Sequence, residues 1–117
     1  MAIRRIKTNP RLSRVVVVNG VAQLAGTTAL DRKQDIHGQI RQVFARIEED
    51  LAGAGSDKSK LISAWVILKN VSRDFAALNE AWEAWIPAGC APARATWQAD
   101  LAAPDILVEI IVSAAVE

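Results

Sequence analysis

The fold is decided first by the stretch Arg14-Val15-Val16-Val17-Val18-Asn19-Gly20-Val21-Ala22-Gln23-Leu24-Ala25-Gly26, in which an Asn-Gly pair separates two apolar runs. Asparagine and glycine accept the positive φ angles of a type I′ turn, and the twist of that turn matches two antiparallel strands. The stretch therefore predicts a β-hairpin. Before it, residues 3–7 predict a short edge strand that ends at Asn9-Pro10, because proline disfavours helix at the preceding residue.

Two amphipathic helices are predicted after the hairpin. The first has about five turns of about 3.6 residues each, and Gly53 and Gly55 end it because glycine readily takes the left-handed conformation. The second begins at a cap formed by Ser72 or Asp74 and stops near Pro87. The apolar stripes of the two helices consist of Ile36, Ile40, Val43, Phe44, Ile47, Leu51, Phe75, Leu78, Trp82 and Trp85.

Three later segments, residues 61–68, 93–98 and 106–112, have the apolar or alternating patterns of strands. Helices between strands need crossover connections, whereas the hairpin is antiparallel. We therefore expect an α+β fold with one mixed sheet and both helices on one of its faces. The other sheet face is also apolar and needs a cover, which favours an oligomer.

The composition limits the class of protein. With 117 residues, the chain predicts one domain over residues 1–117. Its 14 basic and 13 acidic residues give a formal charge of +1, too little to attract nucleic acid or anionic lipid strongly. No apolar run approaches the roughly 20 residues of a membrane span, and residues 1–7 lack the apolar core of a signal peptide. The single cysteine, Cys90, favours a reducing compartment, so we expect a cytoplasmic protein.

Histidine chemistry is not indicated. The one histidine, His37, has no cysteine or histidine partner at metal-ligand spacing, so we expect no metal site and interpret His37 as a structural or surface residue. The same shortage argues against a catalytic triad. Cys90 could be a reactive thiol, but nothing near it in sequence indicates that it is activated. Trp82 and Trp85 could stack on a ligand, although their helical spacing favours the core or a subunit interface.

The first candidate site residue is Arg94. In the strand over residues 93–98, alternation sends Arg94, Thr96 and Gln98 to one face. The planar guanidinium can bind a carboxylate through two parallel hydrogen bonds, which a lysine cannot do. The alternatives are a solvated strand face or an ion pair.

The second candidate is Glu109, the lone charge in an otherwise apolar strand. A buried charge costs several kcal/mol unless it is paired. Glu109 could therefore form a structural ion pair with an arginine, or it could hold a water in a pocket as a general base or acid. The pattern alone leaves both interpretations open.

These residues carry a resemblance to a known family. Pro92-Ala93-Arg94-Ala95-Thr96, followed by Leu101, Pro104 and Val108-Glu109-Ile110, resembles the C-terminal signature of the RidA (YjgF) family, labelled endoribonuclease L-PSP in older naming. The stretch from Asp74 to Trp85, with Ala88-Gly89 and Ala91-Pro92 after it, is similar to the YoaB-type branch. The resemblance covers essentially the whole chain.

The resemblance implies a chorismate-mutase-like fold and a homotrimer, with a central β-barrel and clefts between subunits. It further implies hydrolysis of reactive 2-imino or 2-enamino acids to 2-oxo acids and ammonia, without a cofactor. The residue matching Arg94 then holds the substrate carboxylate, and Glu109 positions the attacking water. Gly26, Thr27, Asn79 and Thr96 match positions that line or support the cleft.

The sequence departs from the family pattern at three places. Leu12 stands where many members have a tyrosine, Thr96 stands where several have cysteine, and the segment Ala25-Gly26-Thr27 stands where Ser-Gly-Gln is common. The preferred imine is therefore open. An alternative function is a trimeric protein that binds small carboxylates and regulates a partner without chemistry. A third, endoribonuclease activity, is disfavoured by the near-neutral charge and the few aromatic residues.

Overall fold

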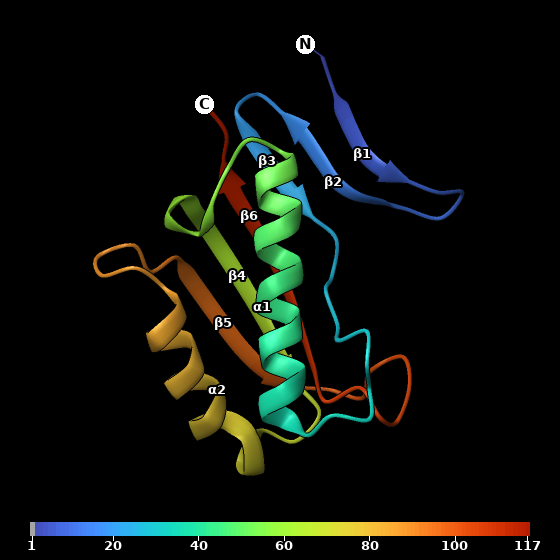
Figure 1. Ribbon diagram of the computed structural model, residues 1–117, viewed down its shortest axis with the longest axis vertical. Helices are drawn as coiled ribbons and strands as arrows, with labels where there is room; N and C mark the ends of the chain where they lie inside the picture. Colours follow the sequence, from blue (N-terminus) through green and yellow to red (C-terminus); the bar gives the residue numbers. More distant parts are fainter. Residues whose placement is uncertain (1) are drawn as a thin grey trace.

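A computed structural model of the chain describes residues 2–117. One six-stranded sheet carries two helices on one of its faces (Figure 1). The elements are β1 (Arg4–Thr8), β2 (Ser13–Val18), β3 (Val21–Leu24), α1 (Ile36–Gly53), a 3-10 turn (Lys58–Lys60), β4 (Leu61–Leu68), α2 (Val71–Trp85), β5 (Ala93–Gln98) and β6 (Val108–Ala115).

The sheet is mixed, as predicted. Its strand order is β1-β2-β3-β6-β4-β5. The pair β4 and β5 is parallel, because α2 forms a crossover between them, and the other neighbours are antiparallel. The strands β1 and β5 are therefore the two edges of the sheet.

The Asn-Gly hairpin is confirmed. Asn19 and Gly20 have φ angles of 50° and 74°, as a type I′ turn requires. The turn fixes the register, so that Val18 pairs with Val21 and Val15 with Leu24. The predicted edge strand before the hairpin is also present as β1.

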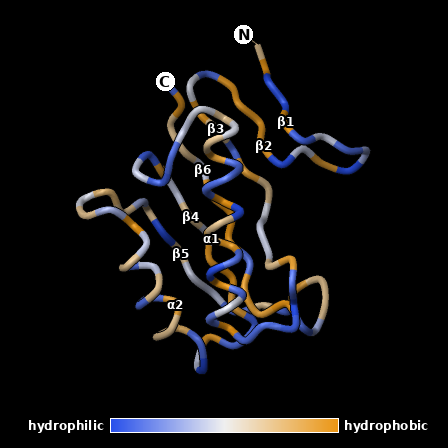
Figure 2. The backbone as a smooth tube through the Cα atoms, in the orientation of Figure 1, coloured by the Kyte–Doolittle hydropathy of each residue, from blue (hydrophilic) through white to orange (hydrophobic). Residues whose placement is uncertain are grey.

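The first predicted helix is confirmed as α1. The Asp35 side chain caps it by accepting a hydrogen bond of 2.9 Å from the backbone N–H of Gly38. At the other end, Gly55 has a φ angle of 80°, which lets the chain leave the helix. Hydrophilic and hydrophobic colours alternate along α1 in Figure 2, since one side packs on the sheet and the other faces outward.

The predicted bounds of two elements were wrong. The cap of α2 is Asn70, whose side chain accepts a hydrogen bond of 2.9 Å from the backbone N–H of Arg73, rather than Ser72 or Asp74. Asp74 is instead buried and pairs with the Arg73 side chain. The last strand runs from Val108 to Ala115 rather than over residues 106–112. It begins later because Ile106 is buried in the preceding loop and the backbone N–H of Leu107 donates to the side-chain oxygen of Gln39 in α1.

The core lies between the sheet and the helices. Trp82 and Trp85 belong to it, and Phe44 of α1 stacks on Trp85 with ring centroids 4.1 Å apart. The opposite sheet face carries no helix and exposes Trp65 and Trp97, whose rings meet edge to face. The predicted second apolar face is therefore present. None of the helices within residues 2–117 is long and apolar enough to cross a membrane.

Candidate functional site

Arg94 lies on the edge strand β5 and faces helix α2. Its Nη2 donates a hydrogen bond of 2.6 Å to the side-chain oxygen of Asn79. The guanidinium carbon lies 5.4 Å from the ring centre of Trp82 and 6.0 Å from that of Phe75, within the range of cation–π attraction. Helix α2 thus holds the arginine from one side and leaves other guanidinium N–H groups available.

The Arg94 guanidinium has no carboxylate partner within 4.0 Å among residues 2–117. Partial burial lowers the pKa of Arg94 below its ordinary value, while the charge of Glu83 opposes that shift. Arginine stays protonated in proteins all the same. A half-buried cation without a counter-ion is suited to bind an external anion, and its fork of donors matches a carboxylate.

Thr96 and Gln98 share the helix-facing side of β5 with Arg94, as alternation predicted. The Gln98 side chain accepts a hydrogen bond of 2.9 Å from the backbone N–H of Val71 and so helps to begin α2. In contrast, the hydroxyl oxygen of Thr96 is buried and has no hydrogen-bond partner within residues 2–117. Two side chains beside α2, those of Arg94 and Thr96, therefore retain unused hydrogen-bonding capacity.

Glu109 lies on the sheet face that carries no helix. Its neighbour Ile110 points into the core, so alternation along β6 turns the Glu109 side chain to the other side. The carboxylate lies directly beside Gly26, and a Cβ atom at position 26 would overlap the Glu109 carboxylate. Only glycine fits this position while the carboxylate keeps its place.

Arg94 and Glu109 flank the same strand from opposite faces of the sheet. Ala64 of β4 pairs with Arg94 on one side, and Ile67 of β4 pairs with Glu109 on the other. The predicted site residues therefore form two groups. Arg94, Asn79 and Thr96 form one, and Gly26 with Glu109 forms the second; the two groups do not face one another within one chain.

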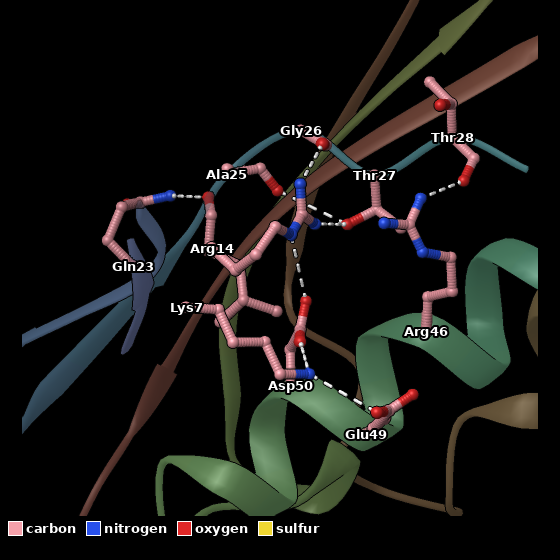
Figure 3. A network of polar contacts seen from close by, with 11 residues as sticks. Lys7, Arg14, Gln23, Ala25, Gly26, Thr27, Thr28, Arg46, Glu49 and Asp50 are labelled. Carbon is pink, nitrogen blue, oxygen red and sulfur yellow. Dashed lines mark hydrogen bonds and ion pairs between the residues drawn. The ribbon is translucent and has the colours of Figure 1, made fainter. Parts of the chain in front are cut away.

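Thr27 lies behind Gly26 and not on the surface. It is fully buried, and its hydroxyl accepts a hydrogen bond of 2.7 Å from Nη2 of Arg14. Arg14 in turn lies 3.3 Å from the Asp50 carboxylate of α1 (Figure 3). Sequence reasoning missed this network, although Asp50 stands on the apolar stripe three residues after Ile47, where a charge is unexpected.

The remaining candidates do not join either group. His37 is exposed, and residues 2–117 contain no cluster of three potential metal-ligating side chains. The Cys90 thiol is partly buried and lies 3.7 Å from the carbonyl oxygen of Ala88. Leu12 is 44% exposed in the connection between β1 and β2.

Comparisons with known proteins agree with the family resemblance of the sequence. The family described as Endoribonuclease L-PSP matches residues 2–116. The RutC family protein YoaB of Escherichia coli is 40% identical over 116 residues, which are 99% of this chain and 100% of that protein. The chain belongs to the RidA (YjgF) family.

Two further RidA-family relatives extend this result. A RutC family protein of Haemophilus ducreyi is 39% identical over 114 residues, or 97% of each chain. The crystal structure of a YjgF protein family member from Neisseria meningitidis has a TM-score of 0.94 and 37% identity, and covers 100% of this chain and 97% of that one. Both the sequence and the whole fold thus match the family over essentially their full length.

Proposed function

We propose that this RidA-family chain is a cofactor-independent hydrolase of small, carboxylate-bearing imines, and that it works as a homotrimer. The observation that carries the proposal is the Arg94 guanidinium, which is half-buried and has no counter-ion among residues 2–117. Burying a cation is costly unless an anion compensates it, so a ligand carboxylate is the natural partner.

The trimer would have a chorismate-mutase-like fold with a central β-barrel lined by the helix-free sheet faces. Trp65 and Trp97 support this arrangement because they are 54% and 41% exposed in the single chain. Large exposed aromatic side chains on a sheet face favour burial against another subunit. Each cleft would combine Arg94, Asn79 and Thr96 of one copy with Gly26 and Glu109 of a neighbour.

The chemistry follows from these positions. Arg94 binds the carboxylate of a 2-imino acid through two hydrogen bonds, while Asn79 holds the guanidinium in place. Glu109 accepts a proton from water as the water oxygen bonds to the imine carbon, and the C=N electron pair moves to nitrogen. Glu109 returns this proton to the nitrogen and then carries the hydroxyl proton of the tetrahedral intermediate to it as well, so that the C–N bond breaks, ammonia leaves and the C=O bond of a 2-oxo acid forms. No cofactor is needed, because the imine carbon is already electrophilic and orientation itself lowers the barrier.

The first experiment measures the decay of 2-iminopropanoate generated in situ. Wild type should accelerate its hydrolysis, Arg94→Ala should lose at least about tenfold in kcat/KM, and Arg41→Ala, an exposed arginine on α1, should behave as wild type. Equal rates in buffer, wild type and Arg94→Ala would contradict the hydrolase.

The second experiment tests whether two copies share the cleft. Arg94→Ala and Glu109→Gln subunits are unfolded together and refolded as mixed trimers. If the two residues come from different copies, random mixing regenerates about a quarter of the clefts, because each cleft draws its two halves independently from a ring. A site within one copy would regenerate none. Activity that stays at the level of the single variants therefore excludes the shared cleft.

A non-catalytic carboxylate-binding or regulatory protein is the second candidate. This function is favoured by Leu12, which stands where many family members have a tyrosine in the cleft. The chain contains no tyrosine elsewhere that could replace it. That function predicts that pyruvate raises the thermal midpoint of wild type but not of Arg94→Ala, with no imine turnover. Endoribonuclease activity is disfavoured by the net charge of +1, and RNA cleavage that survived Arg94→Ala would come from another site or a contaminant.

A further inference from the structure

The chain bulges at Ala25 and Gly26, next to Glu109. Gln23 pairs with Ser113 of β6, and Thr27 pairs with Ile110, so four residue steps on one strand oppose three on the other. One extra residue must therefore be accommodated between these pairs. A bulge of this kind interrupts the regular ladder and redirects the local backbone. Here it brings Gly26 against the carboxylate of Glu109.

Arg14 holds this bulge from the side of α1. Its Nη1 donates a hydrogen bond of 3.0 Å to the carbonyl oxygen of Gly26, and its Nη2 donates one of 2.7 Å to the hydroxyl of Thr27. The same hydroxyl donates a hydrogen bond of 3.3 Å to the carbonyl oxygen of Ala25. Both carbonyl groups that flank the Gly26 Cα are thus engaged (Figure 3).

Helix α1 orients the Arg14 guanidinium. The Asp50 carboxylate is 6% exposed and lies 3.3 Å from the Arg14 Nε, the one guanidinium nitrogen that does not bond to the bulge. Lys7 adds a second ion pair of 3.1 Å to the same carboxylate. Because the guanidinium is planar and rigid, fixing one edge fixes the direction of the other N–H groups.

We infer that Arg14 is a positioning residue for Glu109, which acts through Thr27 and the Gly26 bulge. Each of the three guanidinium nitrogens of Arg14 donates a hydrogen bond within the protein, to Asp50, Gly26 and Thr27 respectively. The inference deepens the proposed hydrolase and rests on it, because it assigns a support to the residue that activates water. It also reassigns Thr27 from a ligand contact to this support.

The test uses Thr27→Val, which keeps the buried shape but removes the hydroxyl, and Arg14→Lys, which keeps the charge but removes the fork. Ser56→Ala is the matched control, because it deletes another buried hydroxyl-to-carbonyl hydrogen bond, of 2.6 Å to Ala115, away from the bulge. Each protein is measured for thermal midpoint, for kcat and KM on 2-iminopropanoate, and for the NMR order parameter of the Gly26 amide.

We expect Thr27→Val and Arg14→Lys to lower the Gly26 order parameter from about 0.85 to below about 0.6. Their kcat should fall about tenfold or more with KM nearly unchanged, because Arg94 still binds the carboxylate. Ser56→Ala should lower the thermal midpoint but change neither the order parameter nor kcat. The kcat of Arg14→Lys should stay low even if its thermal midpoint equals that of wild type.

Two results overturn the inference: an order parameter in both variants equal to that of Ser56→Ala, or an unchanged kcat despite a mobile Gly26. Absence of imine turnover in wild type would instead sink the proposed function. In that case the order parameters still decide whether Arg14 and Thr27 hold the bulge, so the two failures are distinguishable.

Discussion

The carboxylate of Glu109 occupies the space that a side chain at Gly26 would need. The two residues belong to neighbouring strand segments, and the bulge before Thr27 brings them together. Glycine at position 26 is therefore required by a tertiary contact rather than by a turn. The contact also fixes the position of the Glu109 carboxylate on the helix-free face of the sheet.

Gly26→Ala should displace the Glu109 carboxylate while the fold persists, because the overlapping atoms end a flexible side chain. We expect a loss of about 1 kcal/mol in the free energy of unfolding and a fall of about 100-fold in kcat. Denaturant unfolding and imine hydrolysis measure the two effects. Gly53→Ala is the control, since a Cβ there meets nothing within 4 Å. Full activity in Gly26→Ala would mean that the position of Glu109 does not matter.

Thr96→Val removes a buried hydroxyl that has no partner within residues 2–117. Replacing an unsatisfied polar atom by a methyl group should raise the free energy of unfolding by about 1 kcal/mol in the absence of ligand. If the hydroxyl contacts bound ligand, the affinity for pyruvate should fall about tenfold in the same variant. Urea titration and calorimetric binding give both values. A loss of stability would indicate that the hydroxyl has a partner in the assembled protein.

Asp50→Ala should be strongly destabilising, because it leaves the Arg14 guanidinium, whose side chain is 17% exposed, without its carboxylate. Removing one member of a buried ion pair costs about 3–5 kcal/mol. Glu49→Ala, one residue earlier and 73% exposed, should change stability little. Equal effects in the two variants, measured by urea unfolding, would show that the Arg14–Asp50 pair does not stabilise the fold.

Asp57 gives the stability a dependence on acid pH. The hydroxyl and backbone N–H of Ser59 donate to its carboxylate and hold the pKa of Asp57 below the ordinary value of 3.8. The stability that these hydrogen bonds add is fully present above pH 3.8 and is lost as the pH falls through the lowered pKa of Asp57 in the folded state. The thermal midpoint of wild type should exceed that of Asp57→Asn at pH 7, and the difference should shrink below pH 3.8. Ser59→Ala should reduce this pH dependence; a constant difference would contradict the assignment.

Local sequence patterns predicted most of the fold. The Asn-Gly turn, the apolar stripe of α1 and the strand β4 each depend on residues close together in sequence, and all three are present. The cap of α2 was misjudged because Asn70, Ser72 and Asp74 all have side chains that can cap a helix. Asn70 caps the helix, whereas Asp74 is buried and pairs with the Arg73 side chain. The burial of Asp74 depends on the tertiary structure.

The site was predictable to a smaller extent. Alternation correctly placed Arg94, Thr96 and Gln98 on one face of β5. It could not predict whether Glu109 of β6 lies on the same face of the sheet or on the opposite one. The face of each strand depends on the sheet order and on α2, which covers Arg94. The Arg14–Asp50 pair joins residues 36 positions apart, beyond any local pattern.

The sequence by itself determined the hairpin, the two amphipathic helices and the identity of the unusual residues Arg94 and Glu109, because backbone preference and hydrophobic period act over a few residues. Tertiary structure alone decided that Arg94 lies under α2, that Glu109 lies on the opposite face, and that Arg14 holds the bulge beside it. The physical reason is that the interaction energy of two charged groups depends on the distance between them in space, and the folded sheet sets that distance.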